Sequence, residues 1–144
     1  MGTIEVLIAL VEAGRLPSRE SWVGLGAAHL DELEAHLGHP IPRAYREFLA
    51  YVGATRQSVA FEGSDIYWPR PLDLKADFVD AYPDVGVPAD STFIFGHQGY
   101  IFFCCIGFDD DPPVVGIQPP SNVGGFTPAG ARFTDWLLQF GLDW

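Results

Sequence analysis

Residues 30–52 read LDELEAHLGHPIPRAYREFLAYV and predict two short amphipathic helices joined by a tight corner. The apolar residues of the first segment recur at i, i+3 and i+7, on one face of an α-helix: Leu30, Leu33 and Leu37. Those of the second segment recur at i, i+3, i+4 and i+7: Tyr45, Phe48, Leu49 and Val52. Between the segments, Gly38 can take the left-handed conformation that ends a helix. Pro42 suits the first turn of the next helix, where its missing N–H is not needed. The sequence therefore predicts a helix–turn–helix corner whose two apolar stripes face one core.

Three further helices are expected outside this corner. The first has Thr3 as its N-cap and ends before Gly14. A weaker helical pattern covers residues 72–82. The last helix has Thr127 as its cap and Pro128 at its first position. An apolar stripe follows in this last helix at i, i+3, i+4 and i+7: Phe133, Trp136, Leu137 and Phe140.

Short runs of aromatic and β-branched residues between turn residues predict the strands. Four such runs are present: residues 58–61, 92–95, 100–106 and 114–117. Residues 64–71 form an edge strand or a loop, because Pro69 and Pro71 cannot donate to a sheet ladder. A Pro/Gly-rich loop covers residues 119–125. This order of elements predicts a single α+β domain over residues 1–144. Its central, mostly antiparallel sheet should carry the N-terminal helices and the C-terminal helix.

The composition limits the classes of protein to which the chain can belong. With 144 residues and 48% hydrophobic content, it is long enough to bury one core. Its longest apolar run, residues 100–106, is much shorter than the roughly 20 residues of a membrane span. The N-terminus has no basic segment of the kind that opens a secretory signal. Cys104 and Cys105 are adjacent and should point to opposite faces of a strand, so they make no disulfide framework. We therefore expect a cytoplasmic protein.

The formal net charge of −11 is the one unusual feature of the composition. Residues 62–111 carry ten acidic side chains against Arg70 and Lys75, so most of the negative field originates there. Such a charge disfavours binding to nucleic acid or to an anionic membrane. Two interpretations remain open. The charge either serves solubility or attracts a basic partner, for which electrostatic steering can raise the association rate by roughly 10 to 10³.

The sequence contains no pattern that is typical of a metal site. His29 and His36 lie about 10.5 Å apart along a helix axis, so they could share a metal only through a ligand between them, such as Glu32. Surface histidines are the simpler interpretation. The run Asp109-Asp110-Asp111 lacks the alternating ligands and the closing Glu of an EF-hand loop, and two prolines follow it at once. That pattern favours a solvated hairpin turn, and we expect no bound metal.

The sequence likewise contains no pattern that is typical of a catalytic site. His97 could in principle activate Cys104 or Cys105, but those thiols lie in a strand that should be buried, and buried structural cysteines are inert. The glycines form no phosphate-binding motif. Nineteen acids allow many carboxylate pairs without identifying one. We therefore expect no catalytic residue and no cofactor.

Several of these stretches resemble the SUKH superfamily, which includes bacterial immunity proteins and fungal cell-wall-synthesis regulators (Smi/Knr-like proteins). The resemblance begins in the helical corner: Glu34, Leu37-Gly38, Ile41-Pro42, Tyr45 and Phe48-Leu49. It continues through three later stretches and the closing Phe-x-x-Trp-Leu helix: residues 93–96, 100–103, 110–114 and 133–137. Ala131-Arg132 departs from the family, which often has Ser before the Phe, and residues 57–87 match little that is specific. The resemblance implies a SUKH-like fold and a role in binding a protein.

Exposed aromatic and acidic residues are the remaining candidates for function. Trp22 and Trp136 are expected in the core, whereas for Trp68 and Trp144 both the core and an interface remain open. We expect the following residues to contact a partner: Asp65, Tyr67, Trp68, Asp109, Asp110 and Asp111. Trp and Tyr are typical interface anchors, and the acids suit a basic protein.

Three hypotheses for function follow. The first, which the resemblance implies, is a non-enzymatic immunity protein that occludes a cognate toxin, with a basic nuclease as the expected toxin. The second is a regulatory adaptor of the same fold with no toxin partner. The third is a small hydrolase that uses a carboxylate pair.

Overall fold

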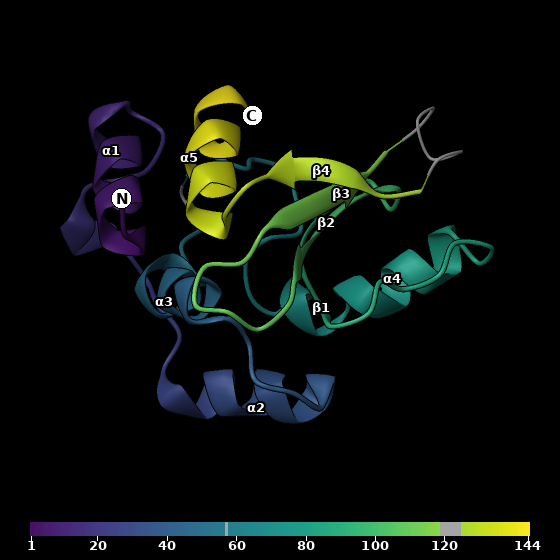
Figure 1. The fold of residues 1–144 in the computed structure, drawn as a ribbon. Helices are drawn as coiled ribbons and strands as arrows, with labels where there is room; N and C mark the ends of the chain where they lie inside the picture. Colours follow the sequence, from purple (N-terminus) through teal and green to yellow (C-terminus); the bar gives the residue numbers. More distant parts are fainter. Residues whose placement is uncertain (57, 119–124) are drawn as a thin grey trace.

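The chain folds as an α+β domain in a computed structural model that describes residues 1–56, 58–118 and 125–144 (Figure 1). The described helices are α1 (Thr3–Glu12), α2 (Ala27–Leu37), α3 (Arg43–Val52), α4 (Leu74–Ala81) and α5 (Phe133–Asp143). Two single turns of 3₁₀-helix join them, η1 (Arg19–Ser21) and η2 (Arg70–Leu72). The described strands are β1 (Ser91–His97), β2 (Ile101–Ile106), β3 (Val114–Ile117) and β4 (Thr127–Gly130).

The four described strands form one antiparallel sheet in the order β1-β2-β3-β4, which confirms the predicted antiparallel sheet and adds β4, a strand that the sequence did not predict. Side chains alternate across the sheet, so Phe102 and Cys104 join a cluster with α4, whereas Phe103 and Cys105 join the larger cluster with α1, α3 and α5. The sheet thus lies between α4 on one face and α1, α3 and α5 on the opposite face, while α2 packs against α3 (Figure 1). The predicted α+β class, with the C-terminal helix packed on the sheet, is confirmed.

The predicted helical corner forms between α2 and α3. Gly38 closes α2 with φ of +81°, the left-handed conformation expected of it. Pro42 is the N-cap of α3 and so lies one residue before the first turn. The Glu34 carboxylate accepts a hydrogen bond from the Ile41 N–H (3.0 Å) and pairs with Arg46 of α3. The corner is therefore closed by a polar staple as well as by the two apolar stripes.

Two predictions at the ends of helices were wrong. Thr127 and Pro128 do not begin the last helix but form β4, where Pro128 stands opposite Val115 of β3. At this outer strand of the described sheet, Pro does not remove a needed ladder bond. The N-cap of α5 is Arg132, with extended backbone (φ −142°). At the other end of the chain, Gly2 caps α1, and Thr3 is its first helical residue.

Two predictions in the first half also need correction. Residues 58–61 form turns and no strand, because Phe61 has φ of +63°, a conformation no strand residue adopts. Trp22 is half-buried at the edge of the core, whereas Trp136 is buried as predicted. Residues 64–71 form a loop that leads into η2, one of the two alternatives the prolines left open. The predicted loop over residues 119–125 lies almost entirely outside the described residues.

Candidate functional site

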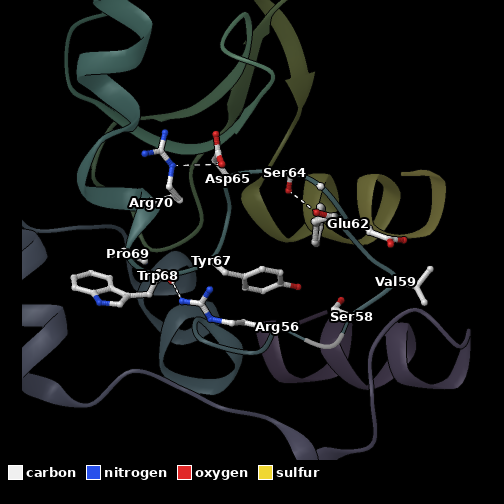
Figure 2. A pocket seen from close by; sticks show the side chains of 12 residues that line it. Arg56, Ser58, Val59, Glu62, Ser64, Asp65, Tyr67, Trp68, Pro69 and Arg70 are labelled. Atoms are coloured by element: carbon white, nitrogen blue, oxygen red, sulfur yellow. Dashed lines mark hydrogen bonds and ion pairs between the residues drawn. The ribbon is translucent and has the colours of Figure 1, made fainter.

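The loop between α3 and α4 encloses a groove of about 680 Å³ (Figure 2). Three of the predicted contact residues line it, namely Asp65, Tyr67 and Trp68. The structure adds further lining side chains that the sequence did not single out: Arg56, Ser58, Val59, Glu62, Ser64 and Arg70. The only sequence signal for this site was a segment rich in Pro, Trp and Tyr without helical or strand periodicity.

The wall of the groove formed by residues 61–65 is held by contacts from several elements. The Phe61 ring stacks on Trp136 (5.9 Å between centroids) and anchors the turn in the core. The indole N–H of Trp144 donates a hydrogen bond to the Glu62 carbonyl (3.0 Å), so this tryptophan is docked on the body. The Asp65 N–H donates to the carbonyl of Gly96 in β1 (2.7 Å). The groove wall is therefore tied to both the sheet and α5.

The two aromatic side chains of the groove are also held from behind. Tyr67 stacks on Phe48 of α3 (6.5 Å), and burial raises the pKa of its hydroxyl. The Trp68 N–H donates to the Gly53 carbonyl (2.8 Å), and its ring lies 4.9 Å from that of His29 in α2. Both rings are half-buried and contribute to the core. In Figure 2 the Tyr67 ring points along the groove towards Ser58, whereas the Trp68 ring points the other way. For Trp68, the structure thus combines the two alternatives left open by the sequence.

Charged groups of both signs surround the aromatic residues. Arg70 is bound by three carboxylates: Asp65 (3.4 Å), Asp73 (3.0 Å) and Asp77. Burial lowers the pKa of Arg70, but these carboxylates outweigh that effect and raise the pKa overall. Across the groove, the guanidinium of Arg56 donates to the Trp68 carbonyl (3.1 Å), as Figure 2 shows.

A second depression of about 410 Å³ adjoins the groove and shares Asp65 and Arg70 with it. Its remaining lining comes from α4 and the β1–β2 turn: Asp77, Asp80, Ala81 and Gly99. Three carboxylates and one guanidinium line this depression, so its charge is negative. The aromatic groove therefore opens beside an acidic region.

The other three predicted contact residues lie elsewhere, in the turn between β2 and β3. Asp109 and Asp110 are exposed, and Asp110 faces Arg43 at the start of α3 (3.4 Å). The Asp111 carboxylate accepts hydrogen bonds from the backbone N–H (3.0 Å) and the hydroxyl (2.6 Å) of Thr134. Asp111 thus serves the start of α5, a use that no local pattern in the sequence indicated. None of the three lines the groove.

The histidines and cysteines lie outside the groove. His29 faces Glu32 at 3.6 Å, both on the exposed side of α2. Among the described residues, no three side chains of His, Cys, Asp or Glu are arranged to hold a metal ion. Cys104 and Cys105 are free and buried on opposite faces of β2, and burial raises the pKa of Cys104 to about 12. Both thiols are therefore protonated at neutral pH.

No protein-family model matches the chain, and no curated protein matches it. The resemblance to the SUKH superfamily thus stays a prediction made from the sequence stretches described above. Within the described residues, no helix has both the length and the apolar character required to cross a bilayer.

Proposed function

We propose that this chain is a non-enzymatic protein-binding module of the cytoplasm that recognises a basic protein. More specifically, we propose an immunity protein that binds a cognate toxin, a basic nuclease, and covers its active surface. The observation that carries the proposal is the groove lined by Arg56 and by residues between 58 and 70, where half-buried Tyr67 and Trp68 lie beside Arg56. Trp, Tyr and Arg are the residue types that most often carry the binding energy of protein interfaces.

The rigidity of this groove supports a binding role. Each aromatic ring is held from behind by another ring, and the adjoining wall is tied to β1 and α5. A partner that docks there does not have to immobilise these side chains. The entropic cost of ordering an interface is correspondingly small.

The charge distribution supports a basic partner. The chain carries a net charge of −11, and the acidic depression beside the groove belongs to the most acidic third of the sequence. A nuclease must be basic where it meets phosphate, and an acidic inhibitor complements that surface. Inhibition then requires only that the nucleic acid be excluded, without any chemical step. The resemblance to SUKH immunity proteins favours the same role.

The test uses the toxin-like reading frame next to the gene for this chain. The toxin should be lethal when expressed alone, and co-expression of this chain should restore growth. Purified toxin and chain should form a complex in size-exclusion chromatography, and nuclease activity should fall as the chain is added. A toxin that remains active and unbound at micromolar concentrations of the chain would refute the immunity function. A neighbourhood without any toxin-like frame would favour the regulatory adaptor.

A matched pair of variants should locate the contact surface. Trp68→Ala removes a half-buried ring from the loop that lines the groove, whereas Asp109→Asn changes an exposed residue in the β2–β3 turn, which does not line it. We expect Trp68→Ala to weaken toxin binding at least tenfold, which corresponds to about 1.4 kcal/mol. Asp109→Asn should have a clearly smaller effect if the groove is the centre of the interface. The reverse order would place the interface at the β2–β3 turn.

A further inference from the structure

The turn at residues 61–64, which is part of the groove wall, is held by N–H groups from two aromatic rings. The indole N–H of Trp144 donates to the carbonyl of Glu62 (3.0 Å). The ring of His97 lies with its Nδ1 3.2 Å from the next carbonyl, that of Gly63. Because a carbonyl can only accept, Nδ1 carries the hydrogen and donates it. The two rings also contact each other edge to face, with centroids 4.7 Å apart. Side chains from the end of β1 and from just beyond α5 therefore hold two consecutive peptide groups.

The backbone of this turn is strained. Phe61 has φ of +63°, a left-handed conformation that an aromatic residue rarely adopts. The composition of residues 58–61 favours an extended strand instead, so local preference and observed conformation disagree. Such a conformation persists only where surrounding contacts impose it. The Phe61 ring is buried in the core, but Glu62 and Gly63 are exposed. The tip of the turn thus depends on the two ring N–H groups more than on burial.

We propose that Trp144 and His97 are positioning residues that act together as a clamp on the turn at residues 61–64. The clamp fixes the place of Glu62 and Ser64, which line one side of the groove (Figure 2). Its release lets the tip of the turn open locally while the Phe61 ring stays in the core. The groove wall is therefore set by two side chains that do not line the groove themselves. The inference rests on the proposed function only in treating the groove as the binding surface.

The experiment removes the two N–H donors and keeps an aromatic ring at each position. The variants are Trp144→Phe, His97→Phe and the double variant, all in the full chain. The matched control is Trp22→Phe. The indole N–H of Trp22 donates to the Pro17 carbonyl (2.9 Å), and this half-buried ring lies outside the groove lining. Control and test variants thus lose the same kind of hydrogen bond, away from the turn and at it.

Amide hydrogen exchange, followed by NMR at several low urea concentrations, measures the opening of the turn. Two N–H groups report on it. That of Ser64 donates to the Phe61 carbonyl (3.1 Å), and that of Asp65 donates to the Gly96 carbonyl (2.7 Å). Exchange through a local opening depends little on urea, because little surface is exposed, whereas exchange through global unfolding depends on it steeply.

We expect Ser64 and Asp65 to exchange through local opening, at least tenfold faster in the double variant than in the wild type. Each lost hydrogen bond should contribute a factor of roughly 2 to 10, so each single variant should be intermediate. In Trp22→Phe, their exchange should stay within about twofold of wild type, because a distant site acts independently. The inference is overturned if both amides exchange only through global unfolding. It is also overturned if the double variant leaves their exchange unchanged or accelerates it no more than the control does.

The readout needs no toxin, so it separates the clamp from the immunity function. Wild-type exchange in the double variant, together with an intact toxin complex, removes only the clamp. Faster exchange in the double variant, together with no toxin binding by the wild-type chain, removes the immunity function and leaves the clamp.

Discussion

Asp111 links the β2–β3 turn to the start of α5. Its carboxylate accepts two hydrogen bonds from Thr134, one of them from a backbone N–H in the first turn of the helix. N–H groups in this turn have no partner within the helix, and a negative charge here also favours the helix dipole. The Asp111 side chain therefore stabilises the start of α5, whereas the side chain of Asp109, two residues earlier, is exposed.

We predict that Asp111→Ala lowers the free energy of unfolding by about 1–2 kcal/mol. Asp109→Ala should change it by less than about 0.5 kcal/mol, as is usual for an exposed site. Urea denaturation followed by circular dichroism measures both values. Equal stability of the two variants would show that the contacts with Thr134 contribute nothing. From the sequence alone, one would expect the three aspartates of this turn to be equivalent.

The two thiols of β2 provide a test of burial on both faces of the sheet. Burial raises the pKa of Cys104 from an ordinary 9.0 to about 12 and that of Cys105 well above 9.0. Neither thiol should react with Ellman's reagent (DTNB) at about pH 8 in the folded chain, because both are protonated and inaccessible. Both should react after unfolding in guanidinium chloride. Rapid reaction of either thiol in the native chain would contradict the burial of that face.

The raised pKa of Cys104 determines how the stability of the fold depends on pH. The folded-state pKa of Cys104 is above its unfolded value. Its contribution to stability is therefore complete below about pH 9 and is lost as the pH rises towards 12. Replacing Cys104 by Ala should make the decline of stability above pH 9 less steep, although it also removes buried volume. Denaturation at a series of alkaline pH values measures this slope.

The segment before α2 and the C-terminal half of α3 form a close backbone contact. The Leu25 N–H donates to the Leu49 carbonyl (2.9 Å), and the Ala54 N–H donates to the Val23 carbonyl (2.9 Å). Gly24 lies between these bonds, where an added Cβ would overlap the backbone carbonyl of Ala50. Only glycine allows the two segments to approach this closely.

We predict that Gly24→Ala destabilises the chain by at least about 2 kcal/mol, because the backbone of α3 cannot move away without breaking these bonds. Gly26→Ala is the matched control. A Cβ at Gly26 meets open space, and loss of glycine at this N-cap should cost less than about 1 kcal/mol. Thermal unfolding of the two variants gives the comparison. Similar midpoints would mean that the two segments separate easily.

The negative charge of the molecule should act mainly on the rate of association. A net charge of −11 produces a field that attracts basic proteins, and salt screens this field. The proposed complex with a basic toxin should show this effect. We predict that the association rate constant falls at least about tenfold between roughly 20 mM and 500 mM NaCl. The dissociation rate of the proposed complex should change much less, because salt does not screen apolar contacts of the kind proposed for the groove. Stopped-flow fluorescence at several salt concentrations separates the two rates, and equal changes in both would argue against steering.

Local pattern determined the elements with strong periodicity or distinctive turn residues. The α2–α3 corner follows from two apolar stripes and from Gly38, whose missing Cβ allows the left-handed turn. The three strands at residues 91–117 follow from dense aromatic and β-branched runs with turns between them. Asp65, Tyr67 and Trp68 were found together because they are close in sequence, in one segment without periodicity.

Tertiary contacts decided the features that local pattern predicted wrongly. A Thr followed by a Pro, as at Thr127 and Pro128, is typical of the start of a helix. In the structure these two residues pair with β3 as part of a strand, and Arg132 is the N-cap of α5. Residues 58–61 have strand-like composition, but Phe61 turns into the aromatic core between the sheet and α5. Propensity is worth only a fraction of a kcal/mol per residue, whereas burying one aromatic ring is worth several times more. The amino-acid order therefore specified the helical corner, the strand meander and the excess of negative charge. Long-range packing alone tied the groove wall to the Gly96 carbonyl of β1 and assigned Asp111 to the start of α5.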